Sequence, residues 1–184
     1  PAGEDFYFLQ QLAKTSGVEM LAGTVVRPSA RFSDRVPFGT GKAVQLQVDD
    51  DRQLFQFSSA KAFSVLQDWL TLIVASTEQP ADAILSAAAE RSVVLERFLV
   101  ELNFAKNWTR LQKNHVKQSN RLHAFHCWFD ALRTRQLLTR LDEGNKVQPQ
   151  EQVAALFVWG GCPEIKERSA QLKFLEKLQN GEKR

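Results

Sequence analysis

Residues 104–132 read FAKNWTRLQKNHVKQSNRLHAFHCWFDAL, and this stretch decides how the chain is expected to fold. Mostly apolar residues recur in it at alternating spacings of four and three, which is typical of a helix face that packs against other helices. The spacing predicts one helix over 104–132, with a face that we call the apolar seam. The seam consists of Phe104, Trp108, Leu111, His115, Gln118, Leu122, Phe125, Phe129 and Leu132.

Polar side chains interrupt the apolar seam near its middle. His115 and Gln118 could set the register or the choice of partner in a helical assembly. The sequence favours a simpler alternative, in which the helix bends there or these two side chains lie at a solvated edge. The polar residues Asn114, Gln118, Ser119 and Asn120 accordingly mark a weak point or a turn.

A row of cations runs beside the apolar seam at the same kind of spacing. Two residues turn a helix by roughly 200°, so these side chains are expected to face away from the seam. No acidic residue lies between Lys106 and Arg121, although helix surfaces usually mix both signs of charge. The row is either a solvated face or a binding surface for phosphate or an acidic protein. Its members are Lys106, Arg110, Lys113, Lys117 and Arg121.

The composition fits a globular protein whose charge is unevenly distributed. The 184 residues carry a net charge of +3, and 43% of them are hydrophobic, which is enough to bury a sizeable core. Residues 101–140 hold eight Lys or Arg against two acidic residues, a local excess of about +6. That local excess, more than the total, favours an anionic partner.

The chain lacks the marks of a secreted or membrane-spanning protein. No run approaches the roughly 20 apolar residues that a membrane helix needs. The start, Pro1 to Asp5, resembles neither a signal peptide nor an initiator methionine, so we expect a piece of a longer protein. The two cysteines indicate no disulfide framework. These features predict an intracellular location, in the cytoplasm or the nucleus.

The first part of the chain has the texture of a β-structure after one short helix. Asp5 is a candidate cap for a helix over 6–14 that stops at Ser16-Gly17. Residues 19–27 have the composition of a strand. Residues 43–48 alternate apolar and polar side chains, and after the turn at 49–52 a second strand continues through residue 57. This pattern predicts an antiparallel hairpin.

The segment 27–42 between these strands has the proline and glycine content of a long loop. It carries the cations Arg31, Arg35 and Lys42, which are candidate contacts to an anionic partner. Phe32 and Phe38 lie between basic residues, where they either stack on nucleic-acid bases or cover the sheet.

Ser58-Ser59 opens an amphipathic helix that ends near Thr77 and has Trp69 at its centre. A hairpin followed by an amphipathic helix with a central Trp is similar to the closing half of a pleckstrin-homology domain. The resemblance covers roughly 35 residues and implies that the helix closes a small β-sheet. It carries no ligand-binding residues over to this chain.

After Pro80 the pattern is helical. It predicts a helix from Asp82 past Leu102 and a final helix whose first turn holds Pro163. Between them it predicts a short apolar helix over 153–159, started by Pro149 and Glu151, that stops at Gly160-Gly161. The fold class is therefore predicted as α+β. A small β-containing portion with its closing helix spans 1–79, and an all-helical portion spans 80–184, either separately or around one shared core.

No constellation of catalytic residues emerges, and we expect no enzyme, no cofactor and no metal. His123 and His126 share a helix face with Cys127 nearby, but a closed zinc site needs paired ligands from two segments, and Cys162 stands alone. The run Gly39-Thr40-Gly41-Lys42 lacks the first glycine, the hydroxyl residue and the following helix of a phosphate-binding loop.

Two functions follow from the sequence. The first is a non-enzymatic interaction or scaffold subunit of a larger assembly, which docks to partner proteins through its helical portion and its basic helix face. The alternative is a nucleic-acid-binding module, for RNA or single strands, that uses the basic row over 106–121 and the loop over 27–42. Binding to an anionic membrane surface is a weaker third possibility.

Overall fold

The computed structural model of the protein describes residues 4–15, 17, 19, 58–143 and 149–179. The chain divides into two compact units, residues 1–56 and 57–184. The first unit contains α1 (Glu4–Thr15), which confirms the helix predicted over 6–14. Gly17 follows it with a φ of +85°, and its N–H donates to the carbonyl of Leu12 at 2.9 Å, as at many helix C-termini.

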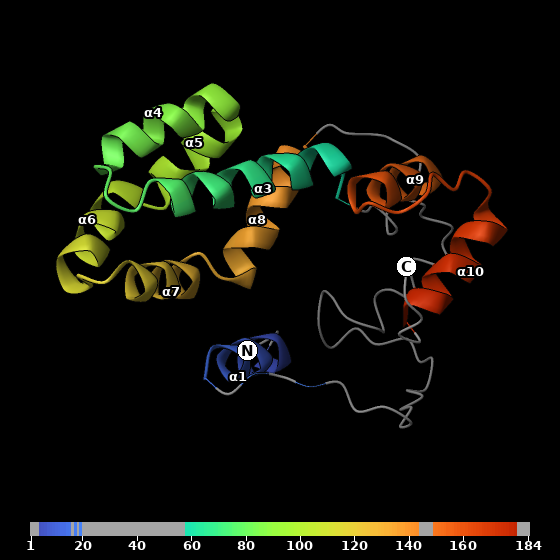
Figure 1. The fold of residues 1–184 in the computed structure, drawn as a ribbon, viewed down its shortest axis with the longest axis horizontal. Coiled ribbons are helices and arrows are strands. Elements are labelled where there is room, and N and C mark those ends of the chain that lie inside the picture. The colour runs from blue at the N-terminus through green and yellow to red at the C-terminus, as the bar shows by residue number, and fades with distance from the viewer. Residues whose placement is uncertain (1–3, 16, 18, 20–57, 144–148, 180–184) are drawn as a thin grey trace, which may run out of the picture. The chain divides into compact units, whose positions relative to one another are not determined.

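The described part of the second unit is built from α-helices. α3, which the prediction placed with residues 1–79, belongs to this unit. Figure 1 shows α3 running beside α4 and crossed by α8, and α3 also contacts α9. The helices are α3 (Ala60–Ala75), α4 (Ala81–Arg91), α5 (Val93–Glu101), α6 (Phe104–Asn114), α7 (Gln118–Trp128), α8 (Ala131–Leu141), α9 (Pro149–Trp159) and α10 (Arg168–Gln179).

The predicted α+β fold class is wrong. Every regular element in the described ranges is an α-helix, and those ranges contain no strand. The predicted hairpin over 43–57 and the loop over 27–42 lie outside the described residues, as does the strand predicted over 19–27 apart from Glu19.

The resemblance to a pleckstrin-homology domain fails at Trp69. This side chain is fully buried, and its ring meets Phe104, Phe125 and Phe129 edge to face, with centroids 5.5, 5.8 and 5.9 Å away. Phe104 lies on α6 and Phe125 on α7, and Phe129 is the residue at which α7 ends. The amphipathic pattern of α3 correctly predicted a buried face, but an apolar face packs equally well on a sheet or on other helices.

The predicted start of α3 is confirmed in detail. The Ser59 Oγ accepts a hydrogen bond from the N–H of Ala62 at 3.1 Å, which makes Ser59 the N-cap. The Asp142 carboxylate, just after α8, accepts from the Ser59 N–H at 2.9 Å and from its hydroxyl at 2.6 Å. These two hydrogen bonds join the first turn of α3 to the end of α8.

The single helix predicted over 104–132 is wrong, because the stretch forms α6, α7 and the start of α8. His115 leaves α6 in an extended conformation. Asp130 begins α8 by accepting a hydrogen bond from the N–H of Arg133 at 3.2 Å, which favours a new helix over continuation of the old one. The predicted weak point near Asn114 and Gln118 is confirmed, because α6 ends at Asn114 and α7 begins at Gln118. Gln118 is exposed and His115 is half-buried, as expected of a solvated edge.

The apolar seam nevertheless persists across the breaks. Phe104, Trp108 and Leu111 on α6 are buried, and so are Phe125 and Phe129 farther along the chain. These residues form one hydrophobic core with α3, α4, α5 and α8. The seam therefore predicted the burial of its aromatic residues correctly, although it did not predict the continuity of the helix.

Two more helix boundaries differ from the prediction, and one agrees. The helix predicted from Asp82 past Leu102 breaks at Ser92, whose hydroxyl accepts from the N–H of Leu95 at 3.3 Å and so caps α5. The last helix begins at Arg168 and not at Pro163. The end of α9 before Gly160-Gly161 is confirmed, and Gly161 has a φ of +74°.

Membrane insertion through a helix finds no support in the described ranges. None of the helices there combines the length and the apolar content that crossing a bilayer requires.

Candidate functional site

α6 carries the two opposed faces that its sequence predicted. Phe104, Trp108 and Leu111 point into the core, while Lys106, Arg110 and Lys113 are exposed. Lys117 is also exposed and lies at the start of α7. We call Lys106, Arg110, Lys113 and Lys117 the basic face. It is the strongest candidate site in the described part of the chain.

The basic face is not neutralised by nearby acids. The sequence contains no Asp or Glu from 102 to 129, so neither α6 nor α7 carries a negative side chain. Within the described ranges, none of the four cations forms an ion pair; the Arg110 guanidinium donates instead to the neutral Asn107 Oδ1 at 3.0 Å. A fixed surface with uncompensated positive charge attracts anions.

Arg121, the last member of the predicted row, does not lie with the others. It is 4% exposed. Its guanidinium donates Nη1 to the Thr77 carbonyl at 2.6 Å and to the Glu78 Oε1 at 2.7 Å. The same group donates Nε to the His115 carbonyl at 3.2 Å and Nη2 to the Val116 carbonyl at 3.3 Å. Arg121 thus acts as an internal tie between the α6–α7 loop and the end of α3.

The sequence held a signal for the burial of Arg121. It lies four residues before the seam residue Phe125, so both belong to the inner face of α7. The break at 115–117 resets the helical phase, and the spacing from Lys117 to Arg121 therefore does not continue the outer row of α6.

The inner side of α6 is hydrogen-bonded to the turn after α3 by side chains that sequence reasoning missed. The Trp108 Nε1 donates to the Gln79 carbonyl at 3.0 Å, and the Gln112 amide donates to the carbonyls of Gln79 and Thr77 at 2.9 and 3.2 Å. Together with Arg121, these donors satisfy carbonyl groups just beyond the C-terminus of α3, where cations and donors are favoured. The basic face is therefore carried by a helix that is fixed on its inner side.

The structure does not describe the three remaining cations that the sequence predicted as partner contacts. Arg31, Arg35 and Lys42 lie outside the described residues. On α7, the Cys127 Sγ lies 3.7 Å from the His123 Nε2. Within the described ranges, no group of three or more His, Cys, Asp and Glu side chains is arranged to hold a metal ion.

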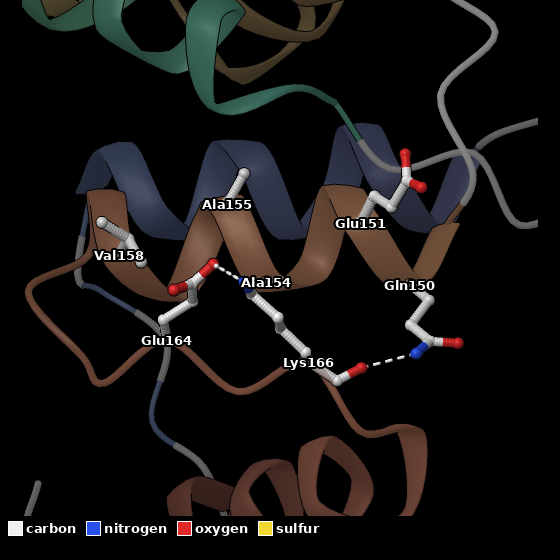
Figure 2. Close-up of a pocket in the computed structure, with 7 residues that line it drawn as sticks. All are labelled: Gln150, Glu151, Ala154, Ala155, Val158, Glu164 and Lys166. Carbon is white, nitrogen blue, oxygen red and sulfur yellow. Dashed lines mark hydrogen bonds and ion pairs between the residues drawn. The ribbon is translucent and has the colours of Figure 1, made fainter.

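A second candidate site, which the sequence analysis missed, is a concave surface between α9 and the segment that follows it (Figure 2). It is an open cavity of about 720 Å³. Its polar groups largely satisfy one another, because Lys166 pairs with Glu164 at 3.3 Å and its carbonyl accepts from the Gln150 amide at 2.5 Å. It offers no catalytic pair and no converging free donors. The lining residues are Gln150, Glu151, Ala154, Ala155, Val158, Glu164 and Lys166.

Comparison of the chain with protein-family models, with curated proteins and with solved structures finds no match. What the chain does must therefore follow from the chemistry of its own surfaces.

Proposed function

We propose that this chain is a non-catalytic interaction subunit that binds an acidic segment of a partner protein through the basic face. The observation that carries the proposal is the exposure of Lys106, Arg110 and Lys113 on one side of α6, with no acidic side chain on α6 or α7. A helix surface that only needed solubility would more often pair Glu with Lys.

The rigid support of α6 strengthens this interpretation. Because Trp108 and Gln112 fasten the inner side of the helix, a ligand on the outer side has to order only the flexible cationic side chains. Lys106 and Lys113 are seven residues apart, which corresponds to about 10 Å along a helix. That length suits a short segment with three or four carboxylates.

The geometry supports a protein partner better than a nucleic acid. With Arg121 buried, the basic face offers only four cations for contact with phosphates. On a single strand each such contact contributes about −0.7 to the slope of the logarithm of the binding constant against the logarithm of salt concentration. Single-strand binding usually adds aromatic stacking. The aromatic residues of α6, Phe104 and Trp108, face the core and are not accessible to bases.

The proposal is tested by fluorescence anisotropy with a labelled peptide of about 12 residues composed of Glu, Asp and Ser, at about 0.05 M and 0.3 M salt. A labelled single-stranded RNA serves as the competing probe. The test variant carries K106E, R110E, K113E and K117E. The control variant carries the same change of net charge at four exposed cations spread over other helices, as K61E, R97E, R135E and K177E.

The proposal predicts that the peptide binds the wild-type chain and that the basic-face variant loses binding at least tenfold, while the control variant keeps most of it. Circular dichroism should be unchanged in both variants, since all eight cations are exposed. Equal losses in the two variants, or no peptide binding at low salt, would overturn it. Tighter binding of RNA than of peptide at equal salt would favour the nucleic-acid alternative.

A further inference from the structure

The loop between α6 and α7 presents an apolar side chain at the edge of the basic face. Val116 is 88% exposed, which is the highest value among the large hydrophobic residues in the described ranges. Single exposed apolar residues are common on protein surfaces, so exposure alone decides nothing. The way in which this residue is held sets it apart.

The backbone of Val116 is fixed although its side chain lies in solvent. The buried Arg121 guanidinium binds the carbonyls of both His115 and Val116, and through Thr77 and Glu78 the same group is bound to the end of α3. Two successive loop carbonyls are thus tied to one buried cation. An apolar side chain on such a support loses little conformational freedom when a partner covers it.

The surroundings of Val116 are cationic and polar. Lys113 lies three residues before it and Lys117 follows it directly, and both are exposed. The adjoining side chains of Asn114 and Gln118 are exposed as well. No other apolar side chain among the residues from Gln112 to Asn120 accompanies Val116, so the loop offers one small apolar contact flanked by two positive charges.

We infer that Val116, Lys113 and Lys117 act together as one docking point, and that the acidic partner segment carries an apolar side chain among its carboxylates. The apolar side chain of the partner packs on Val116 while the neighbouring carboxylates pair with the two lysines. This inference rests on the proposed function and specifies the chemistry of the partner. An anionic membrane fits less well, because interfacial insertion uses a broad apolar face and the neighbours of Val116 are polar.

Two labelled peptides of about 12 residues separate this inference from the proposed function. Both consist mainly of Glu and Asp; the first contains Ser and the second contains Leu at the same positions. The variants are V116S and, as a matched control, V100S, since Val100 is also an exposed valine at 52% but lies on α5. Vesicles with about 30% phosphatidylserine serve as the lipid probe.

The Leu peptide should bind the wild-type chain more tightly than the Ser peptide, and V116S should remove most of that difference, about fivefold to tenfold. V116S should leave binding of the Ser peptide unchanged, and V100S should change neither. The basic-face variant should lose both peptides.

Three results would overturn the inference. If the Ser peptide binds but V116S leaves the Leu peptide unaffected, the inference fails while the proposed function stands. If neither peptide binds the wild-type chain, both fail. If V116S weakens vesicle binding while the two peptides bind equally, Val116 serves a lipid surface instead.

Discussion

The helices from α3 to α8 and the pair α9–α10 differ in how completely they bury their large apolar side chains. In the first group, Trp69 and Trp108 are completely buried, within a cluster of aromatic rings. In the second, Trp159 is 41% exposed and Leu172 is 54% exposed. Large apolar side chains thus lie in a closed core in one region and in a partly covered helix pair in the other.

The contacts that hold the two regions explain the difference. The first group encloses one hydrophobic core, whose burial stabilises it cooperatively. The pair depends on a few contacts, among which the Phe63 and Trp159 rings lie 5.2 Å apart and the Phe157 and Phe174 rings 5.0 Å apart. We therefore expect α9–α10 to open at a lower free energy than α3–α8.

Replacing Trp69 should have the largest effect on stability. W69A removes a fully buried ring from contact with Phe104, Phe125 and Phe129, and should lower the free energy of unfolding by about 3–5 kcal/mol. Urea denaturation followed by circular dichroism measures it. W69F is the control and should cost much less, because the buried Trp69 Nε1 has no hydrogen-bond partner in the described structure to lose. A W69A loss below about 1 kcal/mol would contradict the central place of α3.

Removing Arg121 should have the next largest effect. R121M removes the side-chain donor of the His115 and Val116 carbonyls, leaves the Thr77 carbonyl with Gln112 as its donor, and should lower the free energy of unfolding by about 2–3 kcal/mol. K113M, at an exposed cation of the basic face, should change it by less than about 0.5 kcal/mol. Chemical denaturation compares the two variants, and equal effects would show that Arg121 is not an internal tie.

The contrast between these two cations shows what the sequence could predict. Periodicity identified the buried faces correctly, because Trp69, Trp108 and Phe125 lie at helical spacings that any packed helix requires. The buried aromatic residues of the seam continue beyond the break at 115–117, but the exposed row of cations does not, and Arg121 was placed on the wrong side for that reason.

The fold class was wrong for a different reason: the β-like composition of one segment was used to infer that the next helix packs on a sheet. An amphipathic helix records that it has an apolar neighbour, and not whether that neighbour is a sheet or a helix. The hydrogen bonds of Trp108 and Gln112 to the turn after α3 depend on tertiary positions that no local pattern contains. The part of the basic face on α6 was predictable because Lys106, Arg110 and Lys113 share one side of a single helix.

A smaller and local effect is expected in the α9–α10 pair. W159A removes the ring contact with Phe63 and should weaken the attachment of α9 by about 1 kcal/mol. Hydrogen exchange measured by mass spectrometry should become faster over 149–179 and stay unchanged over α3–α8. Faster exchange in both regions to the same extent would mean that they unfold as one cooperative unit, and the contrast drawn between them would fail.

The smallest expected effect concerns the start of α10. Hydrogen bonds from the Ser169 side chain, the Ser169 N–H and the Ala170 N–H hold the pKa of the Glu167 carboxyl below its usual value of 4.5. A lowered pKa in the folded state means that this cap stabilises α10 above pH 4.5, and that the contribution is lost as the pH falls through the lowered pKa.

Hydrogen exchange over α10, compared between about pH 6 and pH 3 after correction for the intrinsic rates, tests this pH dependence of the Glu167 cap. Acidification should reduce protection of the first turn of α10 in the wild-type chain. E167Q should be less protected at the higher pH and should show a smaller change on acidification, because its amide cannot gain or lose the charge that the N–H groups favour. An equal response in the two chains would mean that acid acts on the attachment of the helix pair and not on its cap.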